Sequence, residues 1–151
     1  MVIDLDPPRG FGSIQIGMPI EAAEQALKEL PGFVPPAEGE VRNKGFAHYD
    51  SELSISLDFD RSGVVRAIEL FRPGRDVQVI FRGLSLFEEP ADVVISRLSE
   101  MVRLEIEEDE LNISAPDVFI GLWRRTLPEI SGDDDGRYFE SVLIAAPGYG
   151  A

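Results

Sequence analysis

The sequence predicts an α+β domain in which two helices pack on an antiparallel sheet of six to eight strands. Two segments carry apolar residues at helical spacing, and several others alternate apolar and polar residues as half-buried strands do. The same order of elements also occurs twice along the chain. A sheet with one apolar face needs helices against that face, so these observations together define the class.

The first half of the chain reads as a strand, a helix and a hairpin. Residues 12–19 form a short alternating strand that enters a glycine turn, and residues 20–30 form a helix that Pro31-Gly32 ends. A loop rich in proline, glycine and charge covers 35–43. Residues 53–59 alternate strictly, turn at Asp60-Arg61-Ser62-Gly63, and return as a partner strand over 64–71.

The second half repeats this order. Residues 77–81 predict a strand, Arg82-Gly83-Leu84 a turn, and Glu89-Pro90 the start of a helix that ends near Val102. After an acidic stretch, residues 118–123 and 138–145 read as strands, with Asp133-Asp134-Asp135-Gly136 as a turn between them.

The repeated order predicts one domain over 1–151 that arose by tandem duplication of a strand-helix-hairpin unit, with repeats 12–71 and 77–145. Gly17 matches Gly83 at an offset of 66 residues, and Leu53 matches Val118 at an offset of 65. The last strands are shifted by about ten more, which an insertion around 126–131 accounts for.

Two short motifs carry a family resemblance. They are Ile16-Gly17-Met18-Pro19-Ile20 before the first helix and Phe59-Asp60-Arg61-Ser62-Gly63-Val64 at the hairpin turn. A strand, Gly-Met, a short helix and such a hairpin resemble the small module of bacterial outer-membrane assembly lipoproteins, and the tandem form resembles β-lactamase inhibitor proteins. In size and acidity the chain also resembles immunity proteins that neutralise bacterial toxins. It departs from the first two families in having no cysteine and no signal peptide.

Charge narrows the choice of partners. The chain has 14 basic and 28 acidic residues, a formal net charge of −14. This field repels nucleic acid and anionic lipid and attracts a basic protein surface. No stretch approaches the ~18 apolar residues of a membrane span, and the N-terminus is acidic, so we expect a cytoplasmic protein that binds neither nucleic acid nor membrane.

Two acidic segments are the candidate partner-binding residues, and both belong to the second half. They are Glu105, Glu107, Glu108, Asp109 and Glu110, and Asp133, Asp134 and Asp135. Such runs are also typical of solvated loops, or of edge strands whose charge repels pairing with another chain. The single tryptophan, Trp123, ends an alternating strand, which favours a place in the core over a place at an interface.

One spacing matches a calcium-binding loop. Asp58, Asp60, Ser62, Gly63 and Glu69 stand where an EF-hand places oxygen ligands and its glycine. Because strand patterns flank the motif on both sides, we predict a β-hairpin turn and no specific metal site.

The sequence shows no nucleophile–base pair and no phosphate loop, so it favours a non-catalytic protein-binding domain, such as an inhibitor or immunity protein, without a cofactor. The alternatives are a small hydrolase or lyase with a carboxylate site in a cleft between the halves, and a small-ligand or calcium-binding domain.

Overall fold

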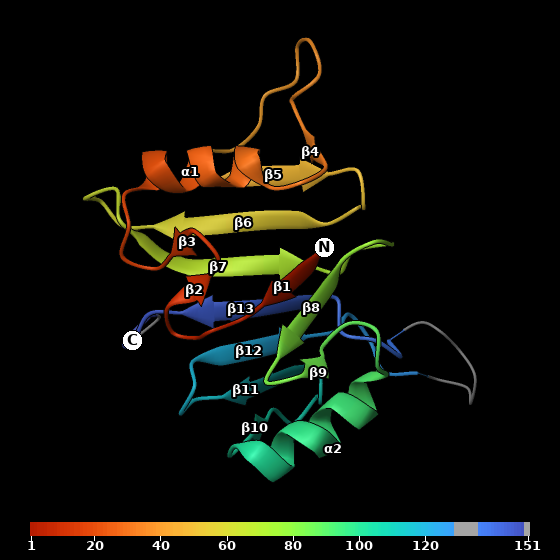
Figure 1. Ribbon diagram of the computed structural model, residues 1–151. Coiled ribbons are helices and arrows are strands. Elements are labelled where there is room, and N and C mark those ends of the chain that lie inside the picture. Colours follow the sequence, from red (N-terminus) through yellow and green to blue (C-terminus); the bar gives the residue numbers. More distant parts are fainter. Residues whose placement is uncertain (129–135, 150–151) are drawn as a thin grey trace.

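The computed structural model describes residues 1–128 and 136–149 (Figure 1). The first half contains β1 (Val2–Asp4), β2 (Gly10–Phe11), β3 (Ile14–Gln15), α1 (Ile20–Glu29), β4 (Phe33–Val34), β5 (Phe46–Tyr49), β6 (Ser54–Phe59) and β7 (Val65–Phe71). The second half contains β8 (Gln78–Phe81), β9 (Leu84–Ser85), α2 (Ala91–Met101), β10 (Glu105–Ile106), β11 (Asn112–Ala115), β12 (Ile120–Trp123) and β13 (Ser141–Ala145).

An eight-stranded antiparallel sheet is the centre of the fold. Its order is β10-β11-β12-β13-β7-β6-β5-β4. Each half contributes four neighbouring strands, and the last strand of each half, β7 and β13, pair with each other at the middle. The predicted α+β class with two helices on an antiparallel sheet is therefore confirmed.

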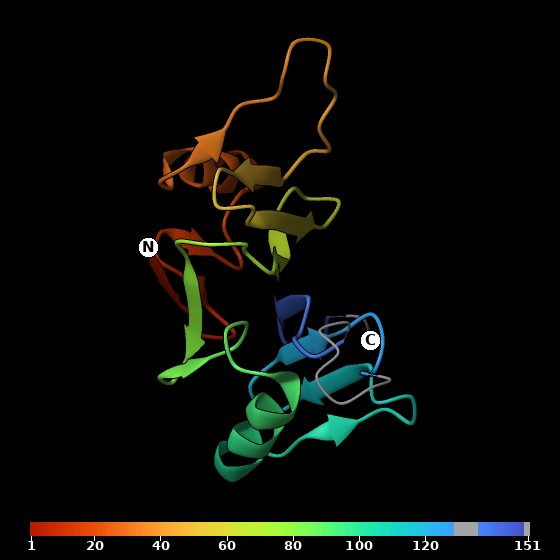
Figure 2. The same cartoon turned by 90° about the vertical axis from the view of Figure 1, so that its right-hand side faces the viewer.

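Both helices lie on the same side of this sheet, one at each end (Figure 2). In α1 the residues that face the sheet are Ile20, Ala23, Ala26 and Leu27, and in α2 they are Ala91, Val94 and Leu98. These positions recur every three or four residues, so each helix has one apolar stripe to bury. The hydroxyl of Tyr49 in β5 donates to the carbonyl of Leu27, 2.7 Å away, and ties α1 to the sheet.

A smaller sheet fills the space between the helices. It has the order β1-β8-β9, and β1 runs parallel to β8, with Ile3 opposite Val79. The strand predicted at 77–81 is found as β8, but it lies in this small sheet and not in the single antiparallel sheet that the sequence predicted. No pattern in the sequence predicted β1. A further two-stranded sheet joins β2 and β3.

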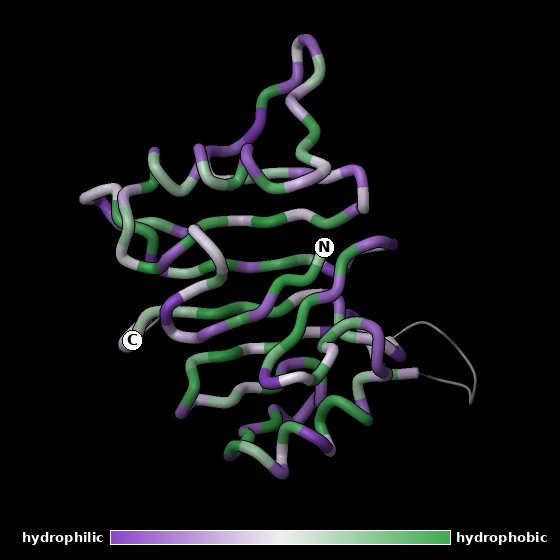
Figure 3. The backbone as a smooth tube through the Cα atoms, in the orientation of Figure 1, coloured by the Kyte–Doolittle hydropathy of each residue, from purple (hydrophilic) through white to green (hydrophobic). Residues whose placement is uncertain are grey.

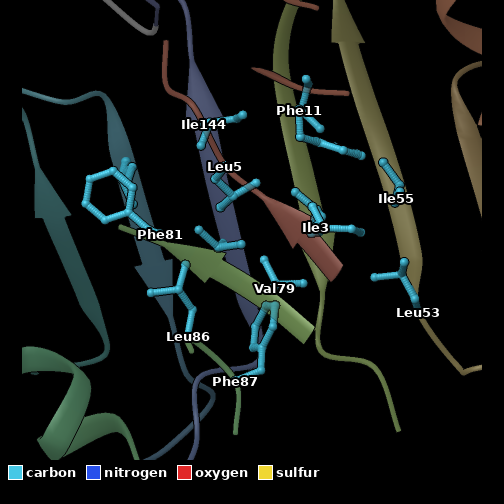
Figure 4. Close-up of a cluster of buried hydrophobic side chains, with 14 of the residues drawn as sticks. Ile3, Leu5, Phe11, Leu53, Ile55, Val79, Phe81, Leu86, Phe87 and Ile144 are labelled. Atoms are coloured by element: carbon cyan, nitrogen blue, oxygen red, sulfur yellow. The ribbon is translucent and has the colours of Figure 1, made fainter. Parts of the chain in front are cut away.

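The core lies between the two sheets. Ile3 and Leu5 from the N-terminal segment and Val79 and Phe81 from β8 face Ile55 and Ile144 of the large sheet (Figure 4). Apolar residues recur along the central strands, whereas many of the connecting loops are polar (Figure 3). The small sheet thus covers the middle of the large one, where neither helix reaches.

The acidic stretch after α2 begins as an edge strand of the large sheet, one of the two forms that the sequence predicted for it. It forms a hairpin of β10 and β11, in which Ile106 pairs with Ile113. The sequence signal for β11 was weak because only Ile113 and Ala115 are apolar there. The strand predicted at 118–123 is shorter, since Val118 and Phe119 form the turn from β11 into β12, with Phe119 at φ 59°.

The two halves follow the order that the repeat predicts. Gly17 and Gly83 both have positive φ, 97° and 82°, in turns that precede the helices. The strands β4–β7 and β10–β13 then form two four-stranded meanders. Their common origin, and with it the repeats 12–71 and 77–145, stays a prediction.

Candidate functional site

The large sheet has one covered face and one face that carries no helix among the described residues (Figure 2). Alternation along each strand separates the two. In β7, for example, Ile68 and Leu70 are buried against the core, whereas Glu69 and Phe71 are half-buried and point the other way. The second face holds two rows of side chains, which together we call the open face.

The first row crosses seven strands at one end of the sheet. It follows the pairing register through Val34, His48, Ser54, Phe71, Ser141, Trp123 and Asn112. Bulky and small residues alternate along it, so each large side chain stands beside a shorter neighbour. Trp123 is 36% exposed and Val34 is 39% exposed.

The second row runs parallel to the first, two residues along each strand. It contains Phe46, Ser56, Glu69, Leu143, Gly121, Ser114 and Glu105. A Cβ built on Gly121 would stand 3.9 Å from the Cβ of Leu143, which confirms that both residues face the same way. The ring of Phe46 meets the ring of His48 edge-on, with centroids 4.7 Å apart, and links the two rows.

A shallow hollow of about 450 Å³ opens around Trp123 on this face. Phe71, Arg125 and Glu140 also line it. The Nε of Arg125 lies 3.6 Å from Oε2 of Glu140, and this oxygen is buried without a hydrogen-bond partner in the described residues. The hollow therefore combines two aromatic side chains with charged groups of both signs.

The C-terminal segment reaches the other end of the open face. The hydroxyl of Tyr149 donates to Oδ2 of Asp58, which is paired with Ala67 in the sheet. This hydrogen bond, with burial and the nearby carboxylates as smaller causes, raises the pKa of Tyr149 to about 12.

The candidate acidic residues of the second half lie at the edge of this face. Glu105 belongs to the second row, and Glu107, Glu108, Asp109 and Glu110 form the tip of the β10–β11 hairpin; we call these five residues the acidic hairpin. All five are exposed. Only Glu105 has an ion pair among the described residues, at 2.9 Å to Arg103. Asp133, Asp134 and Asp135 lie outside the described residues.

The four candidate calcium ligands lie in the β6–β7 hairpin and serve its geometry. Oδ1 of Asp60 accepts hydrogen bonds from the backbone N–H groups of Ser62 and Val64, at 2.9 and 3.1 Å. Asp58 is bonded to Tyr149, and Glu69 stands opposite Ser56 further along the sheet. In the part of the chain that the structure describes, no group of three or more histidine or acidic side chains is placed to hold a metal ion.

Sequence reasoning missed the open face as a unit. It placed Trp123 in the core, but the side chain is exposed on the other side of β12 from buried Ile120 and Leu122. Alternation in β6 and β7 showed that Ser56 and Glu69 face outward. The register between distant strands, which brings Phe71 beside Ser141 and Trp123, has no signal in the sequence.

The junction between the halves is a continuous ladder. Five residue pairs join β7 to β13, from Ser141 opposite Phe71 to Ala145 opposite Ala67. The alternative of a carboxylate site in a cleft between the halves stays a prediction.

Comparisons of the chain with models of protein families, with curated proteins and with solved structures found no match. The resemblances to inhibitor, lipoprotein and immunity families therefore stay predictions. No helix among the described residues is long and apolar enough to cross a membrane.

Proposed function

We propose that the chain is a cytoplasmic, non-catalytic protein-binding domain whose open face contacts a partner with a basic surface. The observation that carries the proposal is the pair of residue rows on a sheet face that no helix of residues 1–128 and 136–149 covers. In a domain of this class the helices cover one face, and a second face that exposes aromatic and aliphatic side chains favours an interface.

The composition of the open face supports a protein partner. Trp123 and Phe71 offer large rigid contact surfaces, and Ser141, which lies between them in the first row, is buried. Its described charges within the two rows are the carboxylates of Glu69 and Glu105. A basic partner surface would complement them.

The acidic hairpin supports a role in association. Its carboxylates lie at the tip of a projecting turn, next to Asn112 at the end of the first row. Exposed charges of one sign raise the rate at which an oppositely charged protein arrives, more than they raise the final affinity. We assign contact to the open face and steering to the acidic hairpin.

A matched pair of variants tests the contact. Trp123→Ala removes a side chain that is 36% exposed on the open face, and Met101→Ala removes one that is 37% exposed at the end of α2 on the opposite side. For a partner recovered from the native host, the Trp123 variant should weaken binding by about 2 kcal/mol, as interface hot spots do. Equal affinities of the two variants, measured by calorimetry, would reject the open face as the interface.

A second pair tests steering. Glu107→Lys with Glu108→Lys should slow association in surface plasmon resonance, and the difference from the wild type should shrink as salt rises, because exposed charges are screened beyond ~8 Å at physiological ionic strength. Glu29→Lys with Glu100→Lys changes the net charge equally on the helix side and is the control. The same slowing in both pairs would assign the effect to net charge alone.

A further inference from the structure

Among the residues that the structure describes, Arg124 is the one charged residue that is buried. It follows β12 directly, and its side chain is 4% exposed. Burial of a guanidinium is costly unless its charge and its donors are well compensated. The position therefore needs a physical explanation.

The polar contacts of Arg124 within the described residues are long, and its guanidinium also lies 5.8 Å from the centroid of the Phe139 ring. Nε donates to the carbonyl of Glu110 and Nη1 to the carbonyl of Gly136, both at 3.3 Å, and Nη1 lies 3.6 Å from Oδ1 of Asp92. A bidentate arginine–carboxylate pair has two short parallel bonds of about 2.7–2.9 Å. Asp92 makes no such pair here, and its own side chain is 85% exposed.

Arg124 lines a hollow of about 370 Å³ between α2 and the β10–β11 hairpin. The other walls are mostly aliphatic and come from Ile95, Ile106, Ile113 and Leu127. Asp92 and Glu110 supply the acidic part of the lining. Apolar walls with a few convergent polar groups, in a volume of roughly 300–1,000 Å³, are typical of small-molecule sites.

We propose that this hollow binds a small aliphatic amino acid, with its carboxylate on Arg124, its ammonium on Asp92 and its side chain against the isoleucines. The buried guanidinium selects a carboxylate, because a carboxylate can accept the parallel hydrogen bonds that Asp92 does not. The aliphatic walls select an apolar body.

The acidic residues decide between an amino acid and a simple fatty acid. An anion without a positive group would meet Asp92 and Glu110 at the lining and the field of a chain whose formal net charge is −14. An ammonium group reverses this repulsion close to the site. A simple amine is disfavoured in turn, since it would bring a cation against Arg124.

This site is separate from the open face. Ile106 and Ile113 point toward the covered side of the hairpin, whereas Glu105 and Ser114 point to the open side. The proposal does not depend on a protein partner.

The test uses the intact chain and isothermal titration calorimetry with three probes of nearly equal shape: leucine, 4-methylpentanoate and 3-methylbutylamine. Isoleucine and valine are tested beside leucine, because their side chains are shorter or branched differently. We expect at least one amino acid to bind with Kd below about 1 mM. The carboxylate and the amine should each bind about tenfold more weakly or worse, because each lacks one charge-assisted contact. No heat from any of the three amino acids up to 10 mM, taken as roughly ten times that expected Kd, or equal binding of the amine, would overturn the proposal.

Two variants assign the contacts. Asp92→Asn changes an exposed side chain and should leave the fold intact. It should weaken binding of the amino acid about tenfold and leave binding of 4-methylpentanoate unchanged or stronger. Arg124→Gln should abolish binding of both acids, with far-UV circular dichroism as the check on folding. Unchanged amino-acid binding in Asp92→Asn would overturn the assignment of the ammonium, even if the Arg124 variant does not fold. The control for a remote charge change is Lys44→Gln, because Lys44 pairs with Glu21 of α1, at the other end of the large sheet from α2.

Discussion

At the scale of single residues, one hydrogen bond, between Tyr149 and Asp58, holds the C-terminal segment against the open face. The tyrosine donates to the carboxylate, and the pKa of its hydroxyl rises to about 12. The ordinary value for tyrosine is about 10. A raised folded-state pKa means that the neutral form is favoured in the folded protein, so this stabilisation is present below pH ~10 and is lost as the pH rises through about 12.

We predict that Tyr149→Phe lowers the free energy of unfolding at neutral pH by about 0.5–1 kcal/mol, a small value because the pair is largely exposed. The variant should also remove one high-pH step from the ultraviolet titration of tyrosine. Urea unfolding and absorbance at 295 nm measure the two effects. A titration of Tyr149 near the ordinary value would contradict the hydrogen bond.

Predictions of which side chains are buried were right where the local sequence pattern determines burial. They were wrong where the pairing of distant strands determines it. The alternation at 53–59 correctly predicted that Ile55 and Leu57 are buried and that Asp58 is exposed. For Trp123 the sequence favoured the core and was wrong, because Trp123 alternates with buried Leu122 and therefore faces the other side of β12. Arg124 was invisible for another reason: arginine is rarely buried, so composition alone predicts a surface residue.

At the scale of elements, the β6–β7 hairpin shows turn chemistry that mimics a metal motif. Gly63 has φ 77°, and its carbonyl accepts the N–H of Ile20 at the start of α1. Asp60 satisfies two further backbone donors of the turn. The turn therefore positions the first helix as well as the hairpin.

Gly63→Ala should lower the free energy of unfolding by about 1–2 kcal/mol, because a side chain disfavours this left-handed backbone. Ser62→Ala, at an exposed neighbour in the same turn, is the control and should change it by less than about 0.5 kcal/mol. Chemical denaturation with an unchanged m-value gives both numbers. Equal effects in the two variants would contradict the assigned role of the glycine.

Calcium should not bind at Asp58, Asp60, Ser62 and Glu69 with a Kd tighter than about 10 μM, a limit within the range of calcium sensors. The reason is that Asp60 and Asp58 already accept protein hydrogen bonds and Glu69 lies along the strand. Calorimetric titration measures this directly. Tight binding that Asp60→Ala removes would contradict the hairpin assignment.

Elements were predictable to the extent that their apolar spacing is long. Helix α2 was expected from Glu89-Pro90 to Val102 and is found at Ala91–Met101. Strands of two to four residues, such as β1 and β11, carry too few positions for a period to show, and their pairing partners determine them.

At the scale of the whole molecule, the two halves depend on each other. Strand β1 of the first half belongs to the sheet of β8, and β13 of the second half lies beside β7. Either half on its own would expose part of the shared core to solvent. The tandem order suggested two similar units. The pairing of β1 with β8, however, is a long-range contact that no local pattern encodes.

We predict the behaviour of two fragments cut in the exposed segment after β7, residues 1–74 and 75–151. Each fragment alone should lack native near-ultraviolet circular dichroism, and the native spectrum should return when the two are mixed in equal amounts. Their interlocked sheets supply the reason, because neither core is complete alone. A native spectrum from either fragment by itself would contradict the shared core.

The central claim is that the open face is the surface where this domain meets its partner. A photo-crosslinking amino acid placed at Leu143, in the middle of the second row, tests it most directly, with the same substitution at Met101 beyond the helices as the control. We predict a crosslinked partner in the native host from position 143 and none from position 101, with the crosslink lost when Trp123→Ala is added. A partner crosslinked from position 101 alone would place the interface on the helix side and contradict the claim.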